Sequence, residues 1–286
     1  MRTTYEDVTL ADGALSRTVR FDPEGTPTGV IHFVYGFGEH IGMYETTGGD
    51  LSSLGYAVVV HEQRGHGPMP GKTPRERRAA LGVVPSYAWF LKDITTVRGL
   101  IGTWYPGSPV FLWGLSMGGN IAANYVERVT HPPYDKVVLE SPWLRLHQPM
   151  PAAVSAVARV VGTLHPRLAV SSRLDLDAVT RDLGETDKLK QDWVYHDRIS
   201  FRLYTQVKDA GEYAIAHADD IALPALVLTG TGDRIVSVDA IREMARRAGA
   251  NVTLREFDGA YHCLHLDVNK AEVLAAVVEF LGADHT

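Results

Sequence analysis

The chain has 286 residues, of which 45% are apolar and 22% charged, an ordinary composition for a soluble globular protein. Its formal charge of −6 disfavours a nucleic-acid-binding protein, because such proteins usually present a basic face. Cys263 is the only cysteine, which excludes an internal disulfide. The polar first residues carry no signal-peptide core and no apolar run reaches the length of a membrane span, so we expect a cytoplasmic protein without a permanent anchor.

The first half of the chain alternates strand and helix patterns. Residues 5–10 and 15–21 alternate polar and apolar side chains around Asp12-Gly13, which is typical of a β-hairpin. Apolar runs typical of buried strands lie at residues 29–35, 57–61, 109–115 and 136–140. Helix patterns separate these runs at residues 43–54 and 86–104, and another helix is expected directly after the run 109–115. Residues 68–85 are expected to be an exposed connection.

The alternation stops and then resumes in the second half. No buried strand is expected from residue 143 to 217, where residues 152–164 have an almost uncharged, apolar helix pattern. Strands return at residues 225–230 and 251–257, with helices at 238–248 and 270–281. This order predicts an α/β fold with a mainly parallel central sheet flanked by helices. Its core comprises residues 1–142 and 218–286, with a helical cap inserted at 143–217.

Gly114, Ser116 and Gly118 form a Gly-x-Ser-x-Gly pattern between a predicted strand and a predicted helix. In this context the serine sits on a tight strand-to-helix turn, with its hydroxyl above the sheet. The N-terminus of the following helix favours an anion beside the serine. Ser116 could also be a simple helix N-cap, but the flanking glycines favour a nucleophile.

A serine hydroxyl needs a base, and the base needs a carboxylate partner, to act as a strong nucleophile. Asp233 and His262 each follow a predicted strand at its carboxyl end, where open α/β sheets place their sites. The chain order Ser116, Asp233, His262 is the order used by α/β-hydrolases. We favour Asp233 over the rival acid Asp258 because Asp233 ends a buried strand. We also favour His262 over His265 as the base.

The tetrahedral intermediate of acyl transfer needs two N–H donors for its oxyanion. The residue after the nucleophile offers the Met117 N–H, and the loop after the first parallel strand is expected to offer the Phe37 N–H. His40, His61 and His66 lie in neighbouring loops without a carboxylate cluster or paired cysteines. We therefore predict no metal site and no cofactor.

Motifs spread over nearly the whole chain carry a family resemblance. They lie at residues 36–40, 64–67, 114–120, 179–182, 230–236 and 259–265. Together they resemble motifs of the monoacylglycerol lipase and lysophospholipase branch of the α/β-hydrolases, also labelled serine aminopeptidase-like. In the same order, the matching motifs are the oxyanion loop, the Gly-His-Gly turn, the nucleophile elbow, the cap motif, the acid loop and the histidine loop. Tyr35 and Leu115 stand where this family usually has histidines, which bears on the shape of the acyl pocket.

The resemblance implies an α/β-hydrolase fold and a serine hydrolase that cleaves carboxylic (acyl) esters through an acyl-enzyme. Monoacylglycerols or lysophospholipid-type lipid esters are the expected substrates. A small-ester carboxylesterase, a peptidase and an acyltransferase are alternatives within the same chemistry. A catalytically silent ligand-binding homologue is an alternative of another class, because fold does not determine function.

Substrate contacts are expected from Tyr35, beside the oxyanion loop, and from Val154, Val157 and Val161 in the apolar cap helix. That helix could line an acyl tunnel, touch a lipid surface or simply pack on the body of the protein. The expected partners are therefore a small-molecule acyl ester or lipid and, transiently, a membrane surface in contact with the cap. No nucleic-acid partner is expected.

Overall fold

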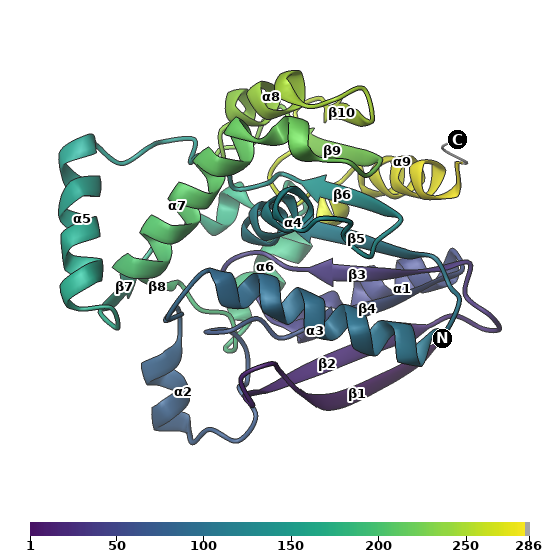
Figure 1. The fold of residues 1–286 in the computed structure, drawn as a ribbon, viewed down its shortest axis with the longest axis horizontal. Coiled ribbons are helices and arrows are strands. Elements are labelled where there is room, and N and C mark those ends of the chain that lie inside the picture. Colours follow the sequence, from purple (N-terminus) through teal and green to yellow (C-terminus); the bar gives the residue numbers. More distant parts are fainter. Residues whose placement is uncertain (284–286) are drawn as a thin grey trace.

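The computed structural model describes residues 1–283 and is organised around one large sheet (Figure 1). Within these residues the sheet has eight strands. From edge to edge they are β1 (Arg2–Thr9), β2 (Leu15–Asp22), β4 (Tyr56–His61), β3 (Gly29–Val34), β5 (Val110–Leu115), β6 (Lys136–Glu140), β9 (Ala225–Gly230) and β10 (Val252–Phe257). The pairs β1–β2 and β2–β4 are antiparallel, and every pair from β4 to β10 is parallel. The predicted mainly parallel sheet is confirmed.

Helices cover both faces of the sheet, which explains the nearly continuous apolar strands. Along β3, Val30 and Val34 enter one apolar cluster, whereas Ile31 and Phe33 enter the other. Burying such side chains stabilises the fold by about 1.5–3 kcal/mol each. The first cluster includes side chains of α3 (Ala88–Trp104), α4 (Met117–Arg128), α7 (Phe201–Ala216) and α8 (Val238–Arg247). The second includes side chains of α1 (Glu45–Ser53) and α9 (Lys270–Gly282).

The segment from 143 to 217 contributes helices that lie outside the sheet, and the helix of residues 152–164 stands at the far left of Figure 1. Its elements are α5 (Ala152–Leu164), β7 (Ala169–Ser171), α6 (Leu183–Gln191), β8 (Arg198–Ser200) and α7. The strands β7 and β8 form a separate antiparallel pair, so the expectation of no buried strand fails at the buried Ile199 and Ser200. Three residues are too few for the alternation that identifies a strand in sequence.

The last helix of that segment packs firmly on the core. The side-chain amide of Asn120, on α4, donates to the carbonyl of Val207 on α7 (3.1 Å). Asn124 likewise donates to the carbonyl of Ala210 (2.9 Å). The division into a core of residues 1–142 and 218–286 and a cap of residues 143–217 stays a prediction, and the last three core residues, 284–286, lie outside the described residues.

Residues 68–85, expected to be an exposed connection, contain the short helix α2 (Pro74–Ala80). The hydroxyl of Thr73 accepts the N–H of Glu76 (3.3 Å), and the Thr73 N–H donates to the Glu76 carboxylate (2.8 Å). This reciprocal capping box starts the helix without any apolar periodicity, because none of its residues is buried. A hydrophobic pattern therefore could not reveal it.

The carboxyl ends of β3, β5, β6, β9 and β10 lie at the same edge of the sheet, because these strands are parallel. Open α/β sheets bind their ligands at this edge. Among residues 1–283 the loops include 3₁₀ helices η1 (Ile41–Tyr44), η2 (Leu176–Ala178), η3 (Ala218–Asp220) and η4 (Leu264–Leu266). Two of them, η1 and η4, follow β3 and β10 closely and shape the candidate site.

Candidate active site

Ser116 occupies the sharp turn between β5 and α4, with φ 54° and ψ −115°. A positive φ is costly for a residue with a Cβ and persists only where the surroundings enforce it. A Cβ on Gly118 would collide with the carbonyl oxygen of Val34, and one on Gly114 would collide with that of Gly118. Glycine at both positions therefore lets α4 pack tightly against the strands. The Ser116 side chain makes no capping hydrogen bond, which disfavours the N-cap interpretation.

The acid and base predicted from sequence are in direct contact. The Nδ1–H of His262 donates to Oδ2 of Asp233 (2.7 Å), and both side chains are buried. Oδ1 of Asp233 accepts the N–H groups of Ile235 (2.7 Å) and Val236 (3.0 Å), which fixes the carboxylate plane. Burial opposes ionisation of the ring, but the Asp233 carboxylate outweighs it and holds the pKa of His262 above its ordinary value. Nε2 of His262 is thereby left to act as the base.

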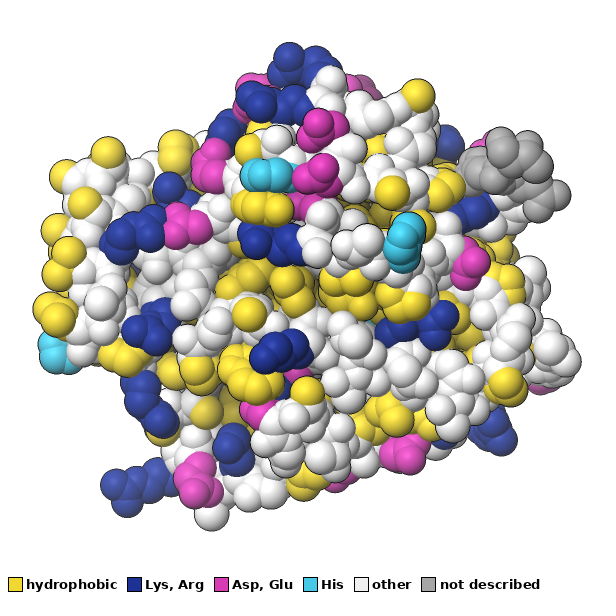
Figure 2. All heavy atoms as spheres, in the orientation of Figure 1, with side chains coloured by type: hydrophobic (Ala, Val, Ile, Leu, Met, Phe, Trp, Pro, Cys, Tyr) yellow, Lys and Arg dark blue, Asp and Glu magenta, His cyan; other side chains and the backbone are white. Residues whose placement is uncertain are grey.

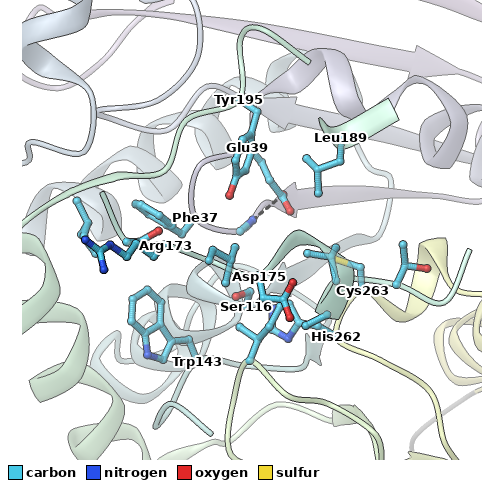
Figure 3. Close-up of a pocket in the computed structure, with 18 of the residues that line it drawn as sticks. Phe37, Glu39, Ser116, Trp143, Arg173, Asp175, Leu189, Tyr195, His262 and Cys263 are labelled. Atoms are coloured by element: carbon cyan, nitrogen blue, oxygen red, sulfur yellow. Dashed lines mark hydrogen bonds between the residues drawn. The ribbon is translucent and has the colours of Figure 1, made fainter. Parts of the chain in front are cut away.

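The rival residues are engaged elsewhere. Asp258 accepts the hydroxyl of Thr231 (3.0 Å) at an exposed position. The His265 ring is buried and donates from Nδ1 to the Glu140 carboxylate (2.9 Å). Ser116 and His262, by contrast, line the same cavity, where Figure 3 shows them next to each other. The geometry is consistent with Ser116, Asp233 and His262 acting together, and their catalytic roles stay a prediction.

A half-buried carboxylate holds the loop after β3. Oε2 of Glu39 accepts the Gly36 N–H (2.9 Å; Figure 3) and the Tyr44 hydroxyl (2.6 Å). Burial raises the pKa of Glu39. A Cβ on Gly36 would lie 3.3 Å from the Ser116 Cβ, so the loop lies directly against the nucleophile. Phe37 lines the cavity at this point. This position is compatible with the predicted donor roles of the Phe37 and Met117 N–H groups.

The cavity has a volume of about 840 Å³, large enough for a drug-sized ligand. Much of its wall is apolar or aromatic, including Phe37, Trp143, Leu146, Val179, Leu189, Ile199 and Tyr204. Charged side chains also line it, namely Glu39, Glu45, Arg173, Asp175, Glu185, Lys188, Asp192 and Arg234. An apolar wall with a limited set of charged groups suits an amphiphilic ligand.

Backbone hydrogen bonds join the segment 143–217 to the loops that carry the site. The N–H of His196 donates to the carbonyl of Gly38 in the oxyanion loop (3.1 Å). The N–H of Cys263, next to the base, donates to the carbonyl of Val179 (2.8 Å). Two different loops of the site thus each share a backbone hydrogen bond with the segment 143–217.

Comparison with known proteins identifies the family. The family described as Serine aminopeptidase, S33, matches residues 25–269 of the chain. The chain belongs to this family. Its α/β-hydrolase architecture recurs in the crystal structure of the monoacylglycerol lipase of Paleococcus ferrophilus, with a TM-score of 0.80 and 31% identity over 92% of this chain and 97% of that one.

Two curated relatives of this S33 family member span nearly the same length. The Monoacylglycerol lipase of Mycolicibacterium smegmatis is 29% identical over 91% of this chain and 90% of its own. The Monoglyceride lipase of Homo sapiens is 32% identical over 90% of this chain and 83% of its own. The chain is therefore an α/β-hydrolase of the lipase and esterase family, as the motif resemblance implied.

The substrate contacts expected of this S33 chain do not lie at the cavity. Tyr35 is fully buried, and its hydroxyl donates to the Glu62 carboxylate (2.6 Å) while accepting the Gln63 N–H (2.6 Å). Both polar functions of the ring are thus used inside the core. The cap-helix residues Val154, Val157 and Val161 are also absent from the cavity wall. We correct the assignment of Tyr35, because its ring points into the core. Val154 and Val157 are exposed and Val161 is half-buried, so contact of these three side chains with the substrate stays a prediction.

Three residues of this S33 chain matter to the site but were not singled out from sequence. Glu39 fixes the oxyanion loop, and its position two residues after Phe37 was the available signal. Trp143 forms part of the cavity wall, and its N–H donates to the Ser116 carbonyl (2.8 Å). Glu140 contacts His265 across 125 residues of sequence, a pairing that no local pattern reveals. Within residues 1–283 no group of three His, Cys, Asp or Glu side chains could hold a metal ion.

Proposed function

We propose that this chain is a serine hydrolase that cleaves carboxylic esters through an acyl-enzyme on Ser116. One observation carries the proposal: Ser116, on a strained turn, lines the same cavity as His262, whose ring is hydrogen-bonded to a buried Asp233. This arrangement provides a nucleophile, a base and the group that orients the base.

In the acylation step, Ser116 Oγ attacks the ester carbonyl carbon while His262 Nε2 takes the hydroxyl proton. The carbonyl π electrons move to oxygen, and the N–H groups of Phe37 and Met117 stabilise this oxyanion. Removing one such donor typically costs about a hundredfold or more in rate. Collapse of the intermediate breaks the bond to the alcohol, which leaves with the proton held by His262.

In the deacylation step, His262 takes a proton from water as the water oxygen attacks the acyl carbon. Collapse of the second intermediate returns that proton to Ser116 and releases the carboxylic acid. Asp233 stabilises the imidazolium in both steps without itself taking the proton. Attack by another alcohol in place of water would give acyl transfer instead of hydrolysis.

The proposed substrates are lipid esters with one acyl chain, namely monoacylglycerols or lysophospholipids. An acyl chain matches the apolar wall formed by residues such as Phe37, Leu189 and Ile199, and a polar head group matches the charged groups of the same cavity. The names of the relatives at about 30% identity also favour a monoacylglycerol.

We also propose that α5 touches the lipid surface that holds the substrate. This helix exposes a row of apolar side chains, with Val157 at 62% and Leu164 at 69%. Figure 2 shows hydrophobic side chains in yellow at the left, where α5 lies in Figure 1. Met150 and Val170 flank α5, are themselves exposed and line the cavity, so the apolar surface continues to the cavity mouth. No helix of residues 1–283 combines the length and apolarity of a membrane span.

The decisive experiment is a substrate panel run with wild type and Ser116→Ala. The panel contains a monoacylglycerol, lysophosphatidylcholine, a short p-nitrophenyl ester and an aminoacyl amide. We expect the wild type to turn over the monoacylglycerol best and Ser116→Ala to be folded and inactive. Ser52→Ala is a matched control, because it removes a buried hydroxyl without a hydrogen-bond partner on α1, outside the cavity.

The remaining outcomes separate the alternatives. Preference for the short ester indicates a carboxylesterase, and turnover of the amide indicates a peptidase. Formation of a new ester with added alcohol indicates an acyltransferase. If a fluorophosphonate probe does not label Ser116 and no substrate turns over, the chain is a silent binding protein and the proposal fails.

A further inference from the structure

A buried ion pair lies beneath the candidate active site and has no role in the proposed chemistry. Glu140, the last residue of β6, and His265, in η4, both have almost no exposed side-chain surface. The Glu140 carboxylate accepts the His265 Nδ1–H (2.9 Å), the His265 backbone N–H (3.1 Å) and the Trp113 Nε1–H (2.9 Å). Each carboxylate oxygen is therefore hydrogen-bonded.

The charge state of this pair follows from its environment. Burial opposes ionisation of both groups, but their mutual attraction and hydrogen bonds outweigh it. The pKa of Glu140 is therefore lowered and that of His265 is raised. The mutual attraction thus favours the charged form of each group. Apolar residues of similar volume often stabilise a fold as well as a buried ion pair does, so stability alone is a weak reason for its presence.

The contacts of Glu140 connect two loops of the site. Its backbone carbonyl accepts the N–H of Ser116 (2.9 Å), which places it directly behind the nucleophile. Its carboxylate holds His265, which lies three residues after the base His262 in the same loop. One residue therefore contacts the nucleophile turn through its backbone and the histidine loop through its side chain.

The contacts extend to the third loop. The His265 ring stacks on Tyr44, with ring centroids 5.9 Å apart. The Tyr44 hydroxyl donates to Glu39, and Glu39 accepts the N–H of Gly36 in the oxyanion loop. The nucleophile turn, the histidine loop and the oxyanion loop are joined in one continuous set of buried and part-buried contacts.

We propose that Glu140 and His265 are positioning residues that set the His262 ring and the oxyanion loop relative to Ser116. The inference rests on the proposed esterase function. It predicts that removing the Glu140 charge disturbs the chemical step and leaves substrate binding intact. A displacement of about 1 Å between reacting groups can cost about a hundredfold in rate.

The test measures kcat and KM of Glu140→Gln and His265→Gln with the p-nitrophenyl ester, together with the rate of fluorophosphonate labelling of Ser116. We expect kcat and the labelling rate to fall about tenfold to a hundredfold and KM to change less than twofold. Because the two residues act as one unit, the double variant should lose little more than either single variant.

Asp93→Asn is the matched control for simple loss of a buried ion pair. Asp93, on α3, is as buried as Glu140 and pairs with Arg64 (2.6 Å), and neither residue lines the cavity. We expect this variant to lower the melting temperature and to keep kcat within twofold of wild type.

The outcomes separate the two proposals. An inactive, unlabelled wild type overturns the proposed function itself. An active wild type with Glu140→Gln kcat within twofold of it overturns only the positioning role. Should Glu140→Gln fail to fold, His265→Gln decides by the same criteria. Failure of both variants to fold assigns the pair a purely structural role and also overturns the inference.

Discussion

Replacing Glu127 with glutamine should stabilise the protein at neutral pH, by an amount that grows as pH rises. Glu127 lies on α4 and is buried, and neither of its carboxylate oxygens has a hydrogen-bond partner. Burial raises its pKa from the usual 4.5 to about 9; Arg128 opposes this shift and Asp220 adds to it. The folded protein therefore carries this side chain as a neutral acid at pH 7.

The magnitude follows from the two pKa values. Between them the folded chain binds a proton that the unfolded chain has released, so stability falls as pH rises from about 4.5 to about 9. Each pH unit in this window changes the free energy of unfolding by about 1.4 kcal/mol. Glutamine binds no proton in either state, so Glu127→Gln removes a penalty of up to about 3 kcal/mol at pH 7 and less than about 1 kcal/mol at pH 5.

Urea unfolding of wild type and Glu127→Gln at pH 5, 6, 7 and 8 measures this difference directly. Glu279→Gln, an exposed position on α9, is the control for loss of a carboxyl group without burial. A gain that does not increase with pH would refute the reasoning, because it would show that Glu127 titrates alike in the folded and unfolded chain. A loss of stability at pH 7 would refute it as well.

Three further predictions concern the site and the helix α5. The His262 ring acts as a base only when it is neutral, and its pKa is raised above the ordinary value. We therefore expect kcat/KM to rise with pH through a midpoint above about 6.5. A midpoint below about 6 in the pH–rate profile would contradict this prediction. Gly118→Ala should lower the free energy of unfolding in urea by more than about 3 kcal/mol, because the new Cβ meets the Val34 carbonyl. Gly99→Ala places its Cβ in open space on α3 and should raise that free energy by up to about 1 kcal/mol. Equal changes in the free energy of unfolding for Gly118→Ala and Gly99→Ala would exclude the steric explanation. Val157→Glu should slow turnover of a monoacylglycerol in vesicles about fivefold and leave the soluble p-nitrophenyl ester unaffected; equal slowing of both would argue against surface contact.

The elements that build the sheet were predictable because their sequence patterns are strong. The run that became β5 is apolar throughout, since it is buried on both faces, and the turn at Gly114 and Gly118 requires residues without a Cβ. By contrast, α2 depends on a capping box with Glu76 and not on apolar periodicity. The three-residue strands β7 and β8 are too short to show alternation.

The placement of Ser116 and His262 at one cavity was predictable, because each follows a strand at its carboxyl end. The sequence could not predict in which direction a side chain points. An apolar helix pattern shows that α5 has an apolar face but not that Val157 on that face points to solvent. Similarly, Tyr35 follows β3 next to the oxyanion loop, yet its ring turns away from the cavity toward Glu62.

The hydrogen bonds from His196 to Gly38 and from Cys263 to Val179 bear on how this family can be engineered. A chimera that takes the residues above the cavity from another member would also replace the backbone partners of two loops of the site. Such a graft would need to carry residues 36–40 and 259–265 with it to keep these interactions. Changes of specificity are then more readily obtained by substituting wall residues such as Leu189 than by exchanging the whole segment.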